Sequence, residues 1–519
     1  MTSFARSAST ENSSRSMLSG GYNIEERCIF NQHPPGCTRA NSRSGRQTSG
    51  NRFPTSRAEI RFMEYPSRGR HRIRRWRAPC AAAAVALLLA MSLGCAEYES
   101  RHLESLSELR LAQGQNALND GRFVEAEDLV HLALLLDDTN HDAHLWMGRI
   151  QLTRYRLERA ESRLRRAIEL APQAPDSYYL LGYLFELEGA FPRAAAYYRK
   201  HLALLPPDSD SVLQAEIETL AHFLAAFGTA EPYDHDKATP PASVAFAGER
   251  DREDALPLVP VSINGLPERA FYLDTKQTGY LRICRETAEA TGLITPAPND
   301  LRGLRPGAGD DSYLMLIDSL SLGPLTIRNV PASVEIAGCG QQVGSVGGKI
   351  GSLDLRLFLI TFDFPRDSLT LIPYPDSLDE YTRFIDAVTS RGLIIRPRFL
   401  NGRVYVEGEI EERRGLLLLD TGALRSTVVS SNASLSGGPG HAMKGGMPPD
   451  PAAQQPEGSL YPETARDVWF SFGGLVERTD VVQLVYERTH PLEIGRLGLD
   501  ILGRYRVTLS YRGSFVMFE

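Results

Sequence analysis

The sequence Leu418-Leu419-Asp420-Thr421-Gly422-Ala423 places an Asp-Thr pair directly after an apolar run, and Tyr272-Leu273-Asp274-Thr275 does the same earlier in the chain. Two carboxylates that face each other can share one proton, so that one acts as a base toward water while the other acts as an acid. A glycine after such a pair permits a tight turn whose backbone comes close to a ligand. A chain that carries both stretches can therefore build a pair of catalytic carboxylates by itself.

The sequence that follows each Asp-Thr pair is also repeated. An apolar-Gly turn with a Leu-Asp pair comes next, and two predicted strands follow it. The first copy comprises residues 349–355, 358–364 and 369–372, and the second comprises residues 496–502, 505–511 and 514–518. The repetition predicts two β-lobes of the same plan.

These motifs resemble those of the retropepsin-like aspartic proteases over residues 257–519. The resemblance implies an all-β, two-lobed fold in which Asp420 and Asp274 are the catalytic pair. Thr421, Gly422 and Thr275 would support this pair.

The same resemblance implies an aspartic endopeptidase that hydrolyses peptide bonds with water, without a cofactor and without a metal. Its polypeptide substrate would lie between the lobes, under glycine-rich flaps near 307–310 and 434–462. Asp354, Asp363 and Asp500 would be structural or surface residues.

The first copy departs from the family pattern at Lys276, where the second copy has Gly422. A long side chain obstructs a tight turn, and an ammonium beside two carboxylates favours their ionised forms. Three interpretations remain open. The chain is an active protease, it is a non-catalytic peptide-binding scaffold, or its second lobe pairs with the same lobe of another copy.

Residues 103–228 are predicted to be helical with a period of 34 residues. The glycines 114, 148 and 182 are in register, as are the alanines 126, 160 and 194, and Pro172 and Pro206 close two of the repeats. This pattern resembles the tetratricopeptide repeats, in which small residues let paired helices pack closely. The resemblance implies a groove for a protein partner, and a rigid spacer is the alternative.

The N-terminal region is predicted to contain a targeting segment. Six arginines between 68 and 77 precede an apolar stretch that ends at Gly94-Cys95, and Met63 is a candidate start. The segment resembles a bacterial lipoprotein signal with lipid attachment at Cys95. Simple secretion and an uncleaved membrane anchor remain alternatives, and each of the three places the remainder outside the cytoplasm. Cys284 and Cys339 would then be paired or be two buried thiols.

Charge separates the N-terminal region from the rest. Residues 1–80 hold 15 Arg and 5 Glu without Lys or Asp, a balance of +10, so the overall charge of −7 leaves −17 for residues 81–519. An acidic remainder argues against a nucleic-acid partner.

The expected architecture is therefore an α-solenoid of tetratricopeptide repeats followed by the two-lobed all-β unit. The expected organisation is residues 1–62 without a fold, 63–95 as signal peptide, 103–228 as repeats, 229–254 as linker, 255–376 as first lobe, 377–394 as the connection and 395–519 as second lobe.

Overall fold

The computed structural model describes most of the chain from residue 101 onward. The described residues are 101–207, 209–236, 240–247, 256–294, 312–335, 346–430, 464–485 and 488–519. The expectations for the signal segment, Cys95, Cys339 and the two glycine-rich flaps lie outside these residues. Within them, no helix combines the length and the apolar character needed to cross a membrane.

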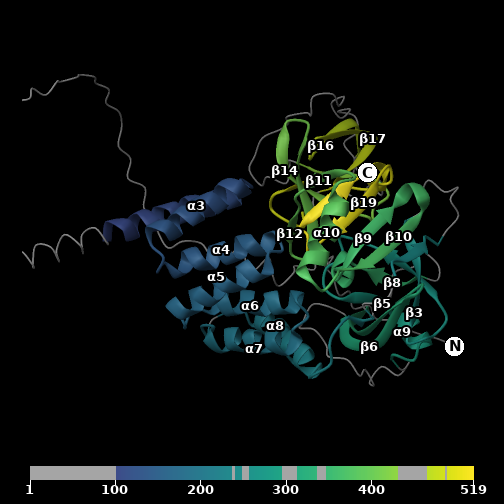
Figure 1. Ribbon diagram of the computed structural model, residues 1–519, viewed down its shortest axis with the longest axis horizontal. Coiled ribbons are helices and arrows are strands. Elements are labelled where there is room, and N and C mark those ends of the chain that lie inside the picture. Colours follow the sequence, from purple (N-terminus) through teal and green to yellow (C-terminus); the bar gives the residue numbers. More distant parts are fainter. Residues whose placement is uncertain are drawn as a thin grey trace, which may run out of the picture.

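The N-terminal half of the described chain is an array of antiparallel helices, stacked beside a β-rich half (Figure 1). Residues 101–119 form its first described helix. The helices that follow are α3 (Phe123–Leu136), α4 (His141–Thr153), α5 (Leu157–Leu170), α6 (Pro175–Leu187), α7 (Phe191–Leu204) and α8 (Ser211–Ala226). Helices α3, α5 and α7 begin 34 residues apart, so the predicted repeat is confirmed.

The small residues in register lie where paired helices touch. A Cβ atom on Gly148 would be 2.6 Å from Cδ2 of Leu164, and one on Gly182 would be 2.6 Å from Cδ1 of Tyr198. Ala160 and Ala194 are fully buried in the same contacts. Each glycine leaves room for a large side chain from the next helix. Glycine therefore recurs every 34 residues because the same contact between paired helices recurs.

The β-rich half contains two lobes with the same strand order. The first is built from β3 (Leu258–Ile263), β4 (Arg269–Leu273), β5 (Leu281–Cys284), β6 (Ser312–Leu322), β7 (Leu325–Glu335) and β8 (Val346–Ile350). The second is built from β13 (Arg403–Ile410), β14 (Arg413–Leu419), β15 (Thr427–Val429), β16 (Thr464–Phe472), β17 (Leu475–Val485) and β18 (Glu493–Leu497).

Each lobe closes into a six-stranded barrel. The orders are β7-β5-β8-β4-β3-β6 and β17-β15-β18-β14-β13-β16, and in each lobe the last strand also pairs with the first: β6 with β7 and β16 with β17. Further elements are α9 (Arg285–Ala290) and the short helices η1 (Ser352–Leu355) and α11 (Leu499–Leu502), which follow β8 and β18. The two lobes therefore share one strand topology, as the repeated motifs predicted.

A third sheet joins the lobes. Its order is β11-β20-β19-β9-β10-β2, from β11 (Leu393–Ile395), β20 (Phe515–Phe518), β19 (Arg506–Ser510), β9 (Phe358–Asp363), β10 (Ser368–Pro373) and β2 (Ala242–Ala245). The central pair β9 and β19 brings Thr361 opposite Thr508, and their hydroxyl oxygens are 3.0 Å apart. Helix α10 (Leu378–Thr389), capped by Ser377, connects the lobes in sequence as predicted.

The segment predicted as a linker contributes to the sheets instead. Strand β1 (Asp234–His235) pairs with β7, and β2 pairs with β10. Extended backbone that lies beside an open sheet edge satisfies its hydrogen bonds by pairing with that edge. The Pro- and Ala-rich composition of this segment did not predict such strands, because the pairing depends on a sheet formed elsewhere in the chain. The described residues of this segment, 229–236 and 240–247, therefore fasten the helices to the lobes.

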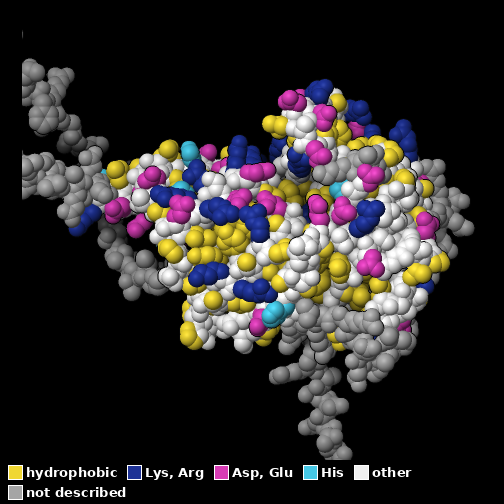
Figure 2. All heavy atoms as spheres, turned by 60° about the horizontal axis from the view of Figure 1, so that its bottom comes forward, with side chains coloured by type: hydrophobic (Ala, Val, Ile, Leu, Met, Phe, Trp, Pro, Cys, Tyr) yellow, Lys and Arg dark blue, Asp and Glu magenta, His cyan; other side chains and the backbone are white. Residues whose placement is uncertain are grey.

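Helices and lobes share one hydrophobic core. A single cluster of buried side chains runs from Phe191 and Phe223 in the array through Phe271 in the first lobe to Phe470 in the second. Figure 2 shows basic and acidic side chains mixed with apolar ones across one face of this assembly. The array is thus packed onto the lobes and is not a detached spacer.

We expect Gly148→Ala to lower the free energy of unfolding by about 1–3 kcal/mol, because its Cβ has no space beside Leu164. In a Leu164→Ala background the same change should be neutral or stabilising, since alanine favours helix by about 1 kcal/mol. Urea unfolding of the four proteins measures this cycle. An equal cost in the two backgrounds would contradict the packing explanation.

Candidate functional site

The two Asp-Thr pairs lie at equivalent places at the ends of central strands. Strand β4 runs parallel to β8 and delivers Asp274, whose N–H donates to the carbonyl oxygen of Ile350 at 3.0 Å. Strand β14 runs parallel to β18 and delivers Asp420, whose N–H donates to the carbonyl oxygen of Leu497 at 3.0 Å. Each pair therefore leaves its strand in the same direction and turns toward the other lobe.

The two threonines form reciprocal hydrogen bonds across the boundary between the lobes. The Thr275 hydroxyl donates to the carbonyl oxygen of Leu419 at 2.5 Å, and the Thr421 hydroxyl donates to that of Leu273 at 2.7 Å. The Thr275 N–H donates to Oγ1 of Thr421 at 3.1 Å, and the Thr421 N–H donates to Oγ1 of Thr275 at 3.1 Å. Both side chains are only 3% exposed. Four reciprocal, water-shielded bonds fix the position of one turn relative to the other.

The carboxyl of Asp274 lies against the second Asp-Thr turn, and it is close enough to Asp420 to raise the pKa of that residue. A Cβ atom on Gly422 would lie 2.8 Å from Cγ and 2.9 Å from Oδ1 of Asp274, so only glycine fits at that position. Asp274 also accepts a 3.0 Å hydrogen bond on Oδ1 from the N–H of Lys276. The carboxyl of Asp420 accepts from the N–H of Gly422 in the equivalent way. The structure thus brings together Asp274, Asp420 and their predicted supporting residues.

Lys276 makes the two carboxyls unequal. Its Nζ lies 3.9 Å from Oδ2 of Asp420, and its carbonyl oxygen accepts from Nε of Arg403 at 3.2 Å. The Asp420 residue is 3% exposed, whereas Asp274, beside Gly422, is half-buried. A long side chain on one turn and a glycine on the other accounts for this difference in burial.

Burial raises the pKa of Asp420 to about 6. The ammonium of Lys276 acts in the opposite direction, and the carboxylate of Asp274 adds to the rise. Desolvation of a charged carboxylate therefore outweighs the attraction of a cation that is itself 38% exposed in its side chain. Asp420 therefore binds a proton at a higher pH than an exposed aspartate does.

The Leu-Asp pairs after β8 and β18 have structural roles, as the resemblance implied. Asp500 accepts from the N–H of Ser426 at 2.8 Å and from its hydroxyl at 2.6 Å. Asp354 accepts from the N–H of Gly351 at 2.9 Å, and burial raises its pKa to about 7. Each carboxyl ties the apolar-Gly turn to the chain that leaves the Asp-Thr pair.

Helix α6 reaches the first Asp-Thr turn through a contact that sequence reasoning missed. The Tyr280 hydroxyl donates to Oε1 of Glu186 at 2.5 Å, and the Tyr198 hydroxyl donates to Oε2 at 2.7 Å. Burial raises the pKa of Glu186. Nε of Arg356, just after η1, donates to the carbonyl oxygen of Leu187 at 2.8 Å. The sequence signal for this contact was Glu186 itself, an acidic residue in an otherwise apolar stretch of α6.

Of the cysteines considered in the sequence analysis, Cys284 lies within the described residues. Cys284 is disulfide-bonded and 1% exposed, so the alternative of a buried thiol does not hold for it. Cys95 and Cys339 lie outside the described residues. Among the described residues, no group of three or more His, Cys, Asp or Glu side chains could hold a metal ion.

Comparisons with solved structures find helical-repeat domains that each cover less than a quarter of this chain. No family model and no curated protein matches the sequence. The tetratricopeptide domain of Arabidopsis OM64 is 19% identical and covers 23% of this chain and 93% of its own, with a TM-score of 0.21. MamA is 23% identical and covers 22% and 66%, with a TM-score of 0.21. A Yersinia enterocolitica type III secretion chaperone, SycD, in complex with a peptide of the translocator YopD is 12% identical and covers 23% of this chain and 92% of its own, with a TM-score of 0.22. The helical-repeat assignment rests on this chain's own register and packing.

We expect Thr421→Val to lower the free energy of unfolding by roughly 2–4 kcal/mol, because it leaves the buried N–H of Thr275 and the buried carbonyl of Leu273 without their partner. Thr421→Ser keeps the hydroxyl and should recover most of that loss. Thermal unfolding of the two variants provides the measurement. A serine variant as unstable as the valine variant would show that the methyl group, and not the hydrogen bonding, holds the lobes.

Proposed function

We propose that the chain is an aspartic-type endopeptidase of retropepsin-like fold, with Asp274 and Asp420 as its catalytic pair. The observation that carries the proposal is the reciprocal Thr275–Thr421 bonding, which presents the two carboxyls from equivalent turns. The duplicated barrels and the shared sheet support it further. The class of substrate would be polypeptide.

The unequal environments of the two carboxyls suggest their roles. Asp420, with a pKa raised to about 6, holds the shared proton, and the more exposed Asp274 is the base. Asp274 takes a proton from water as the water oxygen bonds to the carbonyl carbon, and Asp420 donates its proton to the carbonyl oxygen. Collapse of the tetrahedral intermediate breaks the C–N bond. Asp274 gives the proton that it received to the departing nitrogen, and the ionised Asp420 takes a proton from one hydroxyl of the intermediate, which restores the shared proton.

A peptide-binding scaffold is the second candidate, and Lys276 favours it. An ammonium 3.9 Å from Oδ2 of Asp420 stabilises the ionised carboxylate, which cannot act as the acid. A lobe can keep its fold and its binding cleft after losing its chemistry. Inhibition by a pepstatin-like compound in acid would favour the enzyme, whereas peptide binding without cleavage would favour the scaffold.

We further propose that the protein acts outside the cytoplasm, as a lipid-anchored or secreted protein. The arginine-rich and apolar sequence before Cys95 supports export. The disulfide at Cys284 adds support, since such bonds persist in oxidising compartments. The helical array would offer its remaining exposed surface to a protein partner.

We expect Asp420→Asn to lower kcat for cleavage of denatured casein by about 10²–10⁴-fold, because the amide can neither carry nor donate the shared proton. Asp318→Asn, on an exposed position of β6, is the matched control and should leave the rate unchanged. Activity that survives in the Asp420 variant would rule out the proposed mechanism.

We expect Lys276→Gly to raise kcat/KM and to move the basic limb of its pH profile upward. The ammonium lowers the pKa of Asp420, so its removal lets the shared proton persist to higher pH. Lys276→Arg keeps the charge and should keep the limb in place. Loss of activity in the glycine variant would instead show that Lys276 takes part in the reaction.

A further inference from the structure

The carboxyls of the two Leu-Asp pairs mark corresponding positions in the two lobes. The N–H of Ser426 donates to Oδ1 of Asp500 at 2.8 Å, and the N–H of Leu281 donates to the carboxyl of Asp354. Ser426 and Leu281 therefore correspond to each other, although their side chains differ. Leucine has no hydroxyl, so the first lobe lacks the 2.6 Å bond that the Ser426 side chain makes to Asp500.

The loop that starts at each Asp-Thr pair ends at the residue before this position. The second Asp-Thr loop, residues 420–425, ends at Arg425, which is exposed. The first Asp-Thr loop, residues 274–280, ends at Tyr280, which is 9% exposed. The ring of Tyr280 lies among aromatic rings of the helical array, with centroids 5.6 Å from Phe223 in α8 and 6.3 Å from Phe191 in α7. The first loop thus ends inside the array, and the second ends at the surface.

Glu186, in the last turn of α6, binds the Tyr280 hydroxyl. Its Oε1 accepts from Tyr280 at 2.5 Å, and its Oε2 accepts from Tyr198 of α7 at 2.7 Å. Each carboxyl oxygen therefore binds one phenol, the first from the lobe and the second from the array. Because Tyr280 is buried, breaking its bond to Glu186 leaves a hydroxyl without a partner.

A second contact joins the same end of α6 to the first lobe. Arg356 donates from Nε to the carbonyl oxygen of the last residue of α6 at 2.8 Å, and its guanidinium lies 4.5 Å from the ring centroid of Tyr233. The Tyr233 hydroxyl donates to Oδ1 of Asp354 at 3.4 Å. Asp500 instead takes a hydroxyl bond from Thr479 of its own lobe, at 2.9 Å. The first lobe thus uses residues outside itself where the second lobe uses its own.

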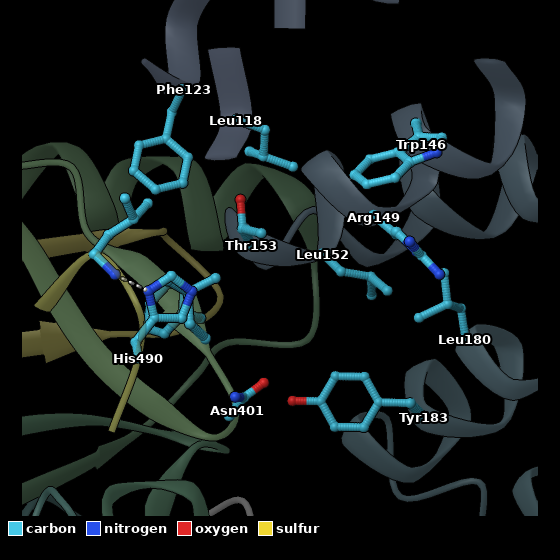
Figure 3. Close-up of a pocket in the computed structure, with 13 residues that line it drawn as sticks. Leu118, Phe123, Trp146, Arg149, Leu152, Thr153, Leu180, Tyr183, Asn401 and His490 are labelled. Atoms are coloured by element: carbon cyan, nitrogen blue, oxygen red, sulfur yellow. Dashed lines mark hydrogen bonds between the residues drawn. The ribbon is translucent and has the colours of Figure 1, made fainter. Parts of the chain in front are cut away.

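The array also meets the second lobe, but away from the second Asp-Thr loop. Figure 3 shows a pocket between them, with Trp146 and Tyr183 of the array on one side and Asn401 and His490 on the other. None of the described residues that line this pocket belongs to the second Asp-Thr loop. This border therefore gives the array no hold on the second loop.

The rest of the first Asp-Thr loop is held by the second lobe. Near its start, the N–H of Thr275 donates to Oγ1 of Thr421 at 3.1 Å. In its middle, the carbonyl oxygen of Lys276 accepts from Nε of Arg403 at 3.2 Å. Release of the end at Tyr280 would therefore leave the loop held from one side only.

We propose that Glu186 is a positioning residue for Asp274: by holding Tyr280, it fixes the end of the loop that carries this carboxyl. The catalytic part of the proposal rests on the proposed function, whereas the holding of the loop depends on no chemistry. A catalytic group displaced by about 1 Å can lose about 10²-fold in rate, so a loop of this kind has to be held at both ends.

Tyr280→Phe removes the hydroxyl and keeps the ring in its aromatic surroundings. Hydrogen exchange of the backbone amides, followed by mass spectrometry on the full chain at neutral pH, measures how often the loop opens. We expect exchange of residues 275–280 to become about fivefold faster, since one buried hydrogen bond is lost, and exchange of residues 421–426 to stay unchanged. Unchanged exchange of residues 275–280 would overturn the proposal.

Tyr178→Phe is the matched control. Tyr178 is 8% exposed and lies on the same helix as Glu186, and its hydroxyl donates to the carbonyl oxygen of Pro172 at 3.0 Å. This variant loses one tyrosine hydrogen bond within the array and should leave the exchange of both Asp-Thr loops unchanged. An equal rise for residues 275–280 in the two phenylalanine variants would report a general loss of stability and would overturn the proposal.

Glu186→Leu tests the acceptor itself. We expect it to speed the exchange of residues 275–280 as Tyr280→Phe does. Adding Tyr280→Phe to this variant should change nothing more, because the hydroxyl has already lost its partner. A full further rise in the double variant would show that Glu186 does not hold the loop.

Cleavage of denatured casein gives a separate readout. We expect Tyr280→Phe to lower kcat about tenfold and to leave KM within about twofold, because the loop carries a reacting group and the change spares substrate binding. Tyr178→Phe should keep both constants. An unchanged kcat in Tyr280→Phe would overturn the positioning role. A wild-type chain that cleaves nothing would count against the proposed function alone, and the exchange of residues 275–280 would still decide whether Glu186 holds the loop.

Discussion

The reciprocal hydrogen bonding of Thr275 and Thr421 is the interaction on which the arrangement of the site depends. Each hydroxyl donates to a carbonyl of the other lobe and accepts from the other threonine's N–H. These four bonds are buried, so their loss would leave unpaired groups in a region that water does not reach. The relative placement of the carboxyls follows from this constraint.

The same approximate two-fold relation extends outward from the threonines. The barrels repeat each other strand by strand, and β9 and β19 meet at the centre of the shared sheet. Asymmetry is introduced where a single residue differs between copies. Lys276 covers Asp420, whereas Gly422 leaves Asp274 half-buried, so two equivalent turns provide carboxyls of different character.

The helical array is part of this structure and does not simply precede it. Glu186 and Arg356 join α6 to the segment around the first Asp-Thr turn, and helix α4 contacts residues 398–400 ahead of the second lobe. The array therefore contacts the two lobes at different points.

The sequence by itself determined the elements whose signals are local or periodic. The 34-residue register of Gly148 and Gly182 predicted the helix pairs, because small residues are needed wherever paired helices touch. The repeated Asp-Thr and apolar-Gly motifs predicted two equivalent lobes, because a duplicated turn needs the same residues twice. Asp274 and Asp420 could be named for that reason.

Tertiary structure alone decided what depends on contacts between distant segments. The strands β1 and β2 within residues 229–254 exist because open sheet edges lie beside them, and no local pattern marks them. The approach of Lys276 to the buried Asp420 and the Glu186–Tyr280 contact likewise join residues far apart in the chain. Desolvation, which sets the pKa of Asp420, is a property of the packed surroundings and not of the residue sequence.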